Sequence, residues 1–267
     1  MKITSAVAVT VAGFAITLGA IPCVSAQTAG QVEELVRASH IIFVGRVERL
    51  HAANLKVVSP TESTILVRVE EVLDVPPSVA SLKGEQVTVQ LAQPGEVKAG
   101  ETEVFFTNGL VFGEHLAVKE VGHISSPGNT AELRKQILEV RAEIADEKVK
   151  ARATGALLIV TGKVLEVKPL GRIGGISEHE GDWAQALVRV DSVDKGSLRE
   201  KTVAVDFPQS TDERWLLSPK FKPGESGIWF LRHPENLGLP QGDWVALSPL
   251  DFQPAAKKEM IRKWLMK

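Results

Sequence analysis

Three blocks of sequence occur twice along this chain, in the same order. Each block carries the alternation of apolar and polar residues that is typical of β-strands, and the copies share glycines and charged residues. The paired segments are 41–48 with 158–166, 67–72 with 188–193, and 98–106 with 222–230. A solenoid unit is only about 20–50 residues long, so this longer spacing indicates two copies of a whole small domain.

Each copy is predicted to contain five strands followed by a helix. The expected strands are 41–50, 64–73, 86–91, 104–107 and 116–121 in copy one, and 157–167, 186–193, 202–207, 227–232 and 244–247 in copy two. An apolar stripe at helical spacing predicts a joining helix over 131–152. The C-terminal segment of the chain matches the beginning of this helix. Gly45 lies inside the first strand, where a missing side chain permits the bend of a small closed barrel.

The repeated order is a glycine-containing strand, a Val-x-Val-x-x-Val strand leading to Lys-Gly, and Gly-Glu before an apolar strand. The clearest examples are 193–196 and 224–231. This order resembles the netrin-like module of the OB superfold, which tissue inhibitors of metalloproteinases share with secreted bacterial proteins. The resemblance implies a mainly β protein of two tandem five-stranded OB-like barrels, each followed by an α-helix, with module 1 at 27–152 and module 2 at 153–267.

The N-terminus has the three parts of a secretory signal peptide. Lys2 supplies the positive charge, 6–21 is apolar, and 24–26 is the small-residue Val-Ser-Ala, which predicts cleavage before Gln27. A secreted or periplasmic location follows, with 1–26 as signal peptide. Lipidation of Cys23 is an alternative, although Pro22 stands where a lipoprotein motif has a small residue.

Cleavage would remove Cys23, the only cysteine of the chain, so the mature protein would be held by core packing alone. The animal inhibitors of the netrin-like family chelate the protease zinc through an N-terminal cysteine. That mechanism cannot be carried over to a chain beginning near Gln27.

The formal net charge of −2 offers no electrostatic reason to expect nucleic acid as a partner, and no later apolar stretch is long enough to span a membrane.

No catalytic constellation stands out in the sequence, and no cofactor is expected. The densest group of potential metal ligands is Glu178, His179, Glu180 and Asp182, whose oxygens and imidazole could hold a divalent cation. The alternative is a solvated acidic loop. No catalytic residue is assigned.

All five tryptophans belong to copy two. Three replace apolar positions of copy one, which favours a packing role, whereas Trp183 and Trp215 lie in inserted loops without counterparts. Exposed aromatic side chains supply contact area at interfaces, so these two are the candidate ligand-binding residues. The competing interpretation is that they cap the end of a barrel.

The residues together favour a secreted, non-catalytic binding or scaffold protein whose partner is another protein. Two alternatives stay open at this point: an extracytoplasmic hydrolase that uses the acidic loop of module 2, and a protease-inhibitor-like protein.

Overall fold

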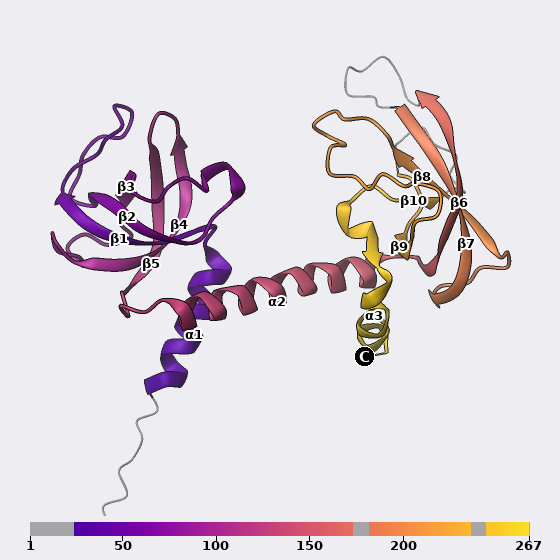
Figure 1. Ribbon diagram of the computed structural model, residues 1–267, viewed down its shortest axis with the longest axis horizontal. Helices are drawn as coiled ribbons and strands as arrows, with labels where there is room; N and C mark the ends of the chain where they lie inside the picture. The colour runs from indigo at the N-terminus through magenta and orange to yellow at the C-terminus, as the bar shows by residue number, and fades with distance from the viewer. Residues whose placement is uncertain (1–23, 173–181, 236–243, 267) are drawn as a thin grey trace, which may run out of the picture. The chain divides into compact units, whose positions relative to one another are not determined.

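The computed structural model describes residues 24–172, 182–235 and 244–266. The chain is mainly β and divides into two compact units, Met1–Val140 and Arg141–Lys267, each with its own sheet (Figure 1). The division falls inside the helix α2, Ala131–Gly155, which begins where the joining helix is expected. The module boundary expected from the sequence, after residue 152, lies near the end of the same helix.

Unit 1 is a closed five-stranded barrel, as expected from the sequence, with strand order β1-β2-β3-β5-β4. Its elements are α1 Val24–Ala38, β1 Ile41–Leu50, β2 Thr64–Asp74, η1 Pro77–Val79, β3 Gln86–Gln90, β4 Thr102–Phe112 and β5 Leu116–Ser125. β3 and β5 run parallel, and all other neighbours are antiparallel. Apolar side chains from alternating positions along the strands fill the barrel. Among them, Phe43 packs on Phe105 with ring centroids 5.6 Å apart.

Unit 2 contains a six-stranded sheet with the order β10-β8-β7-β6-β9-β11. Its strands are β6 Leu158–Arg172, β7 Asp182–Lys195, β8 Thr202–Pro208, β9 Ser226–Leu231, β10 Trp244–Val245 and β11 Phe252–Pro254. The short helices η2 Pro249–Asp251 and η3 Ala255–Lys257 and the helix α3 Lys258–Leu265 complete the unit. β10 is parallel to β8, whereas β11 is antiparallel to β9.

The expectation of five strands is therefore wrong for unit 2, where the expected last strand 244–247 is replaced by two short ones. The interruption is η2, which has Pro249 in its first turn and a capping box between Ser248 and Asp251. Proline has no N–H to donate to a ladder, and the capped turn satisfies the backbone locally, so pairing stops at Val245 and resumes at Phe252.

The first hairpins of the two units are paired in the same register. Arg46 lies opposite Arg68 in unit 1, and Lys163 lies opposite Arg189 in unit 2. The shared register shifts are Ile42/Phe43, Val44/Gly45 and Val47/Arg49 in unit 1, and Ile159/Val160, Thr161/Gly162 and Val164/Glu166 in unit 2. Bulges at equal positions bend both first strands in the same way.

Gly45 and Gly162 each follow the second of these bulges, opposite Val69 and Val190. A Cβ atom on Gly45 would overlap Cγ1 of Val67 and come within 3.3 Å of the carbonyl oxygen of Arg68. A Cβ atom on Gly162 would overlap the carbonyl oxygen of Arg189 itself. Glycine is needed here because the partner strand approaches too closely for a side chain.

Candidate functional site

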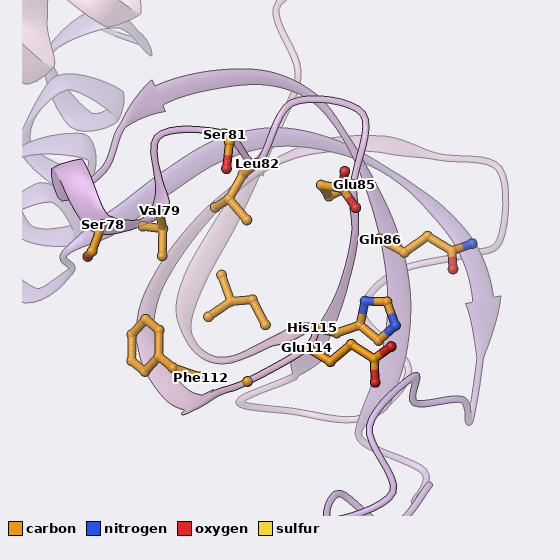
Figure 2. Close-up of a pocket in the computed structure, with 11 residues that line it drawn as sticks. Ser78, Val79, Ser81, Leu82, Glu85, Gln86, Phe112, Glu114 and His115 are labelled. Carbon is orange, nitrogen blue, oxygen red and sulfur yellow. The ribbon is translucent and has the colours of Figure 1, made fainter.

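A pocket of about 450 Å³ opens at one end of the unit 1 barrel (Figure 2). Three parts of the chain line it: η1 with the turn that follows it, the beginning of β3, and the tip of the β4–β5 hairpin. We call it the barrel-mouth pocket, and its lining residues are Ser78, Val79, Ser81, Leu82, Glu85, Gln86, Phe112, Gly113, Glu114, His115 and Leu116.

The two sides of the barrel-mouth pocket differ in chemistry. Figure 2 shows Glu85, Gln86, Glu114 and His115 gathered on one side, while Val79, Leu82 and Phe112 lie toward the other. Val79, Leu82 and Leu116 belong to the barrel core, so the apolar wall is continuous with it. The pocket thus combines a rigid apolar surface with two carboxylates that face solvent.

Phe112 is the most exposed apolar side chain of this pocket, with 62% of its surface accessible. Its ring lies against Gly109, where a Cβ atom would overlap the ring atom Cζ. Leu110, on the same hairpin, is 44% exposed. Large apolar side chains presented next to a pocket supply the contact area that binding sites use.

The side of the pocket that contains Glu85 and Gln86 is held by a network of hydrogen bonds between residues of β1, β2 and β3 and the turn before β3. Arg68 Nε donates to Glu48 Oε1 across 2.5 Å, and Gln86 Nε2 donates to Glu48 Oε2 across 2.5 Å. Arg68 Nη1 also donates to the carbonyl oxygen of Gly84. The hydrogen bond from Arg68 lowers the pKa of the Glu48 carboxyl. Gln86, the first residue of β3, and the preceding turn with Gly84 and Glu85 are therefore held in position beside the pocket.

The pocket holds serine, glutamate and histidine side chains beside an apolar wall, an arrangement that suits binding. Across the described parts of the chain, no group of three or more His, Cys, Asp or Glu side chains could hold a metal ion. An apolar side chain carried next to a cationic group is the ligand that matches both walls.

Trp183 and Trp215, the candidate binding residues of the sequence analysis, are both buried, with 3% and 7% of their surfaces accessible. Their rings meet edge to face at 5.5 Å and form a small cluster with Val245. The expectation that they are exposed is wrong. The segment around Trp215 folds back into a turn, in which Trp215 N–H donates to Asp212 and Ser218 N–H donates to Trp215.

The turn that buries Trp215 leaves its two neighbours in solvent. Leu216 and Leu217 are 60% and 73% exposed, and the Arg214 guanidinium lies 4.6 Å from the centre of the Trp215 ring. Trp215 therefore anchors the loop to the sheet, and the apolar surface that the loop presents belongs to the leucines. Sequence spacing alone could not separate these roles, because all three residues are apolar and adjacent.

Of the proposed metal ligands, Glu178, His179 and Glu180 lie outside the described residues. Asp182 begins β7 with an exposed side chain, and its carbonyl oxygen accepts a hydrogen bond from Gln209 N–H. The metal hypothesis for this loop thus stays a prediction.

The barrel-mouth pocket is not visible in the sequence, because its walls come from two separate segments, 78–86 and 112–116. The one available signal was Phe112 beside Gly113, an aromatic residue at a turn.

No protein-family model matches the chain, and no curated protein matches it either. Within the described residues, no helix is both long and apolar enough to cross a membrane.

Proposed function

We propose that this chain is an exported, non-catalytic binding protein built from two OB-like modules, and that it binds a protein partner through the barrel-mouth pocket of unit 1. The observation that carries the proposal is the pocket itself, in which exposed Phe112 and the core residues Val79 and Leu82 face two carboxylates. The partner would present a large apolar side chain next to lysine or arginine.

The strand order of unit 1 supports the OB-like assignment. A five-stranded barrel in which the first strand pairs with the second and fourth, and the third is parallel to the fifth, agrees with the netrin-like resemblance of the repeated motifs. The equal bulge positions of β1 and β6 support a common origin of the two units. In OB folds, loops at one end of the barrel commonly form the binding surface.

We therefore assign the partner contact to unit 1, and no longer to unit 2, which contains Trp183 and Trp215. Trp183 and Trp215 are buried and offer little contact area, whereas Phe112 is largely exposed. Loops mounted on a rigid barrel are where binding residues commonly lie, and the hairpin tip around Phe112 is such a loop.

Export is supported by the charge, apolar segment and small residues of 1–26. N-terminal sequencing of the protein isolated from its native source tests this part. We expect the mature chain to begin at Gln27, and a chain retaining Lys2 would contradict export by this signal.

Peptide display tests the binding function. The purified full chain is used to select from a library of random linear peptides, and we expect enrichment of sequences that place an aromatic or large aliphatic residue beside Lys or Arg. Phe112→Ala should weaken binding of a selected peptide by about tenfold or more, as for an interface hot spot. Glu85→Gln combined with Glu114→Gln should weaken it and reduce its dependence on salt.

The matched control is Leu217→Ala, which removes a comparably exposed apolar side chain from unit 2. It should leave peptide affinity unchanged. Failure to enrich a common motif, or equal losses from Phe112→Ala and Leu217→Ala, would argue against the proposed site.

A further inference from the structure

The carboxylates of the barrel-mouth pocket are exposed, whereas a second place in the unit 1 barrel contains buried ionisable side chains. Glu120 on β5 is 4% exposed and lies between two partners. Its Oε1 is 2.6 Å from Nδ1 of His123, and its Oε2 accepts a hydrogen bond of 2.8 Å from the backbone N–H of Ala92. Because Ala92 lies in the β3–β4 loop, one carboxylate connects the histidine to that loop.

A second carboxyl group lies close to the same histidine. Glu103 on β4 is 7% exposed, and its Oε2 is buried without a hydrogen-bond partner among the described residues. It is paired with Ser125 on β5, two positions from His123. Because one oxygen of this carboxyl group is buried without a partner, its ionisation is costly, and burial shifts the balance toward the protonated form.

At the two strand pairs equivalent to those of Glu103 and His123, unit 2 has no titratable side chain. In unit 1 the β4–β5 pairs are Glu103 with Ser125 and Phe105 with His123, while in unit 2 the β9–β11 pairs are Gly227 with Pro254 and Trp229 with Phe252. These strand pairs occupy equivalent positions in the two units. The equivalent glycines of the first strands show this, because Gly45 pairs with Glu103 and Gly162 pairs with Gly227.

Unit 2 fills this place with rings. Phe252 packs on Trp229 at 4.9 Å and on Phe221 at 5.3 Å. Aromatic packing is therefore sufficient to close this end of the sheet, and the fold itself does not require Glu103 or His123. The buried ionisable groups of unit 1 call for a role other than packing.

Three carboxyl groups, from β5, β4 and the β3–β4 loop, act on His123. Glu120 belongs to β5, Glu103 to β4 and Glu96 to the β3–β4 loop, and all three favour the imidazolium. The hydrogen bond to Glu120 is the largest of the influences that raise the pKa of His123. Burial is the largest influence on Glu103 and raises its pKa, whereas His123 and a hydrogen bond to Ser125 act in the opposite direction.

A pocket of about 510 Å³ gives solvent access to this cluster. It is lined by the β3–β4 loop residues Ala92, Gln93 and Glu96, by 120–123 of β5, and by two uncharged residues of α1, Gln31 and Leu35. Protons can therefore exchange at His123, whose side chain is 17% exposed.

We propose that Glu103, Glu120 and His123 form a pH-responsive latch, which holds the β3–β4 loop closed while Glu103 and His123 are protonated and releases it when they lose their protons. The latch uses none of the residues of the barrel-mouth pocket and does not depend on the proposed binding function.

The direction of the response follows from proton linkage. In the closed structure the pKa values of both groups are raised above their ordinary values. The latch requires that opening returns them toward the ordinary values, so that closure is most stable below the ordinary pKa values and weakens as pH rises through the raised ones. At high pH, a neutral imidazole would be left among the carboxylates of Glu96, Glu103 and Glu120, whose mutual repulsion opposes closure.

Hydrogen exchange measured by mass spectrometry on the full chain tests the latch, at several values between about pH 5 and about pH 9 with intrinsic rates corrected. We expect protection of the segment 91–101 to fall about tenfold or more across this range, since one unit of pKa difference changes an opening equilibrium tenfold. The two variants described below are the controls for any pH effect on exchange that does not arise from the latch.

Two variants separate the latch from general stability. His123→Phe introduces the residue that unit 2 has at the paired position, and Glu103→Gln removes the charge while keeping the shape. Each should flatten the pH dependence of segment 91–101. A wild-type loop whose protection does not change with pH would overturn the proposal, as would wild-type pH dependence in His123→Phe.

A titration of the His123 ring followed by NMR needs no variant to fold. We expect its midpoint to lie above the ordinary value of 6.5. A midpoint at or below that value would overturn the latch.

Discussion

Both carboxylate oxygens of Asp251 are bound by the guanidinium of Arg152. Arg152 Nε donates to Oδ1 and Nη2 donates to Oδ2 across 2.7 Å, and the aspartate side chain has no exposed surface. Oδ2 also accepts the backbone N–H groups of Leu247 and Ser248 at 2.8 Å each. One buried carboxylate thus joins α2 to the turn that interrupts the last strand of unit 2.

Replacing Asp251 with alanine should destabilise unit 2 by about 3 kcal/mol, because the change leaves Arg152 and two backbone donors without their acceptor. Urea unfolding followed by the fluorescence of the tryptophans, all of which lie in unit 2, measures this loss. Asp146→Ala is the control, since Asp146 pairs with Lys257 at the surface and should cost less than about 1 kcal/mol. Equal losses would contradict the assigned role of Asp251.

Gly45→Ala and Gly162→Ala should both destabilise their units, by about 1–3 kcal/mol, because the added Cβ meets the neighbouring strand. The loss should be larger at Gly162. Its Cβ would meet a backbone oxygen, whereas at Gly45 the nearest atom belongs to the Val67 side chain, which can rotate. Thermal unfolding measures both, and Gly30→Ala is the control, since nothing lies within 4 Å of its Cβ position. Gly45→Val, a larger change, should cost at least as much as Gly45→Ala.

Trp215→Ala should destabilise unit 2 by about 3–5 kcal/mol, the range for removing a large buried aromatic side chain. The loss is expected because Trp215 is buried and packs on Trp183. Denaturant unfolding measures the loss, and Leu217→Ala should be close to neutral. A stable Trp215→Ala protein would show that the tryptophan does not anchor the loop.

Glu48→Gln should reduce stability at neutral pH by up to about 1 kcal/mol, a small value because Arg68 and Glu48 are partly exposed. The pKa of Glu48 is lowered in the folded protein, so its contribution is present above the ordinary value and is lost as pH falls through the lowered one. The variant should therefore lose less stability than the wild type on acidification below about pH 4.5. Parallel acid-unfolding curves for the two proteins would contradict this assignment.

Local pattern determined most strand positions, because alternation of apolar residues is visible without knowing the partner strand. β1 was predicted with its observed bounds, and β2, β3 and β8 differ from prediction by one residue at one end. The interruption of the last strand of unit 2 could have been suspected at Pro249. Its physical cause, however, is the capped turn around Asp251, whose partner Arg152 lies on a helix far away in sequence.

Exposure was decided only by tertiary structure. Trp215, Leu216 and Leu217 are equally apolar in sequence, yet the fold buries the first and exposes the other two. The barrel-mouth pocket and the cluster of Glu103, Glu120 and His123 likewise arise from β-pairing between separate strands. A strand's own residues determine that it is a strand, but which side chains meet depends on register and on what covers each face, and these are properties of the folded chain.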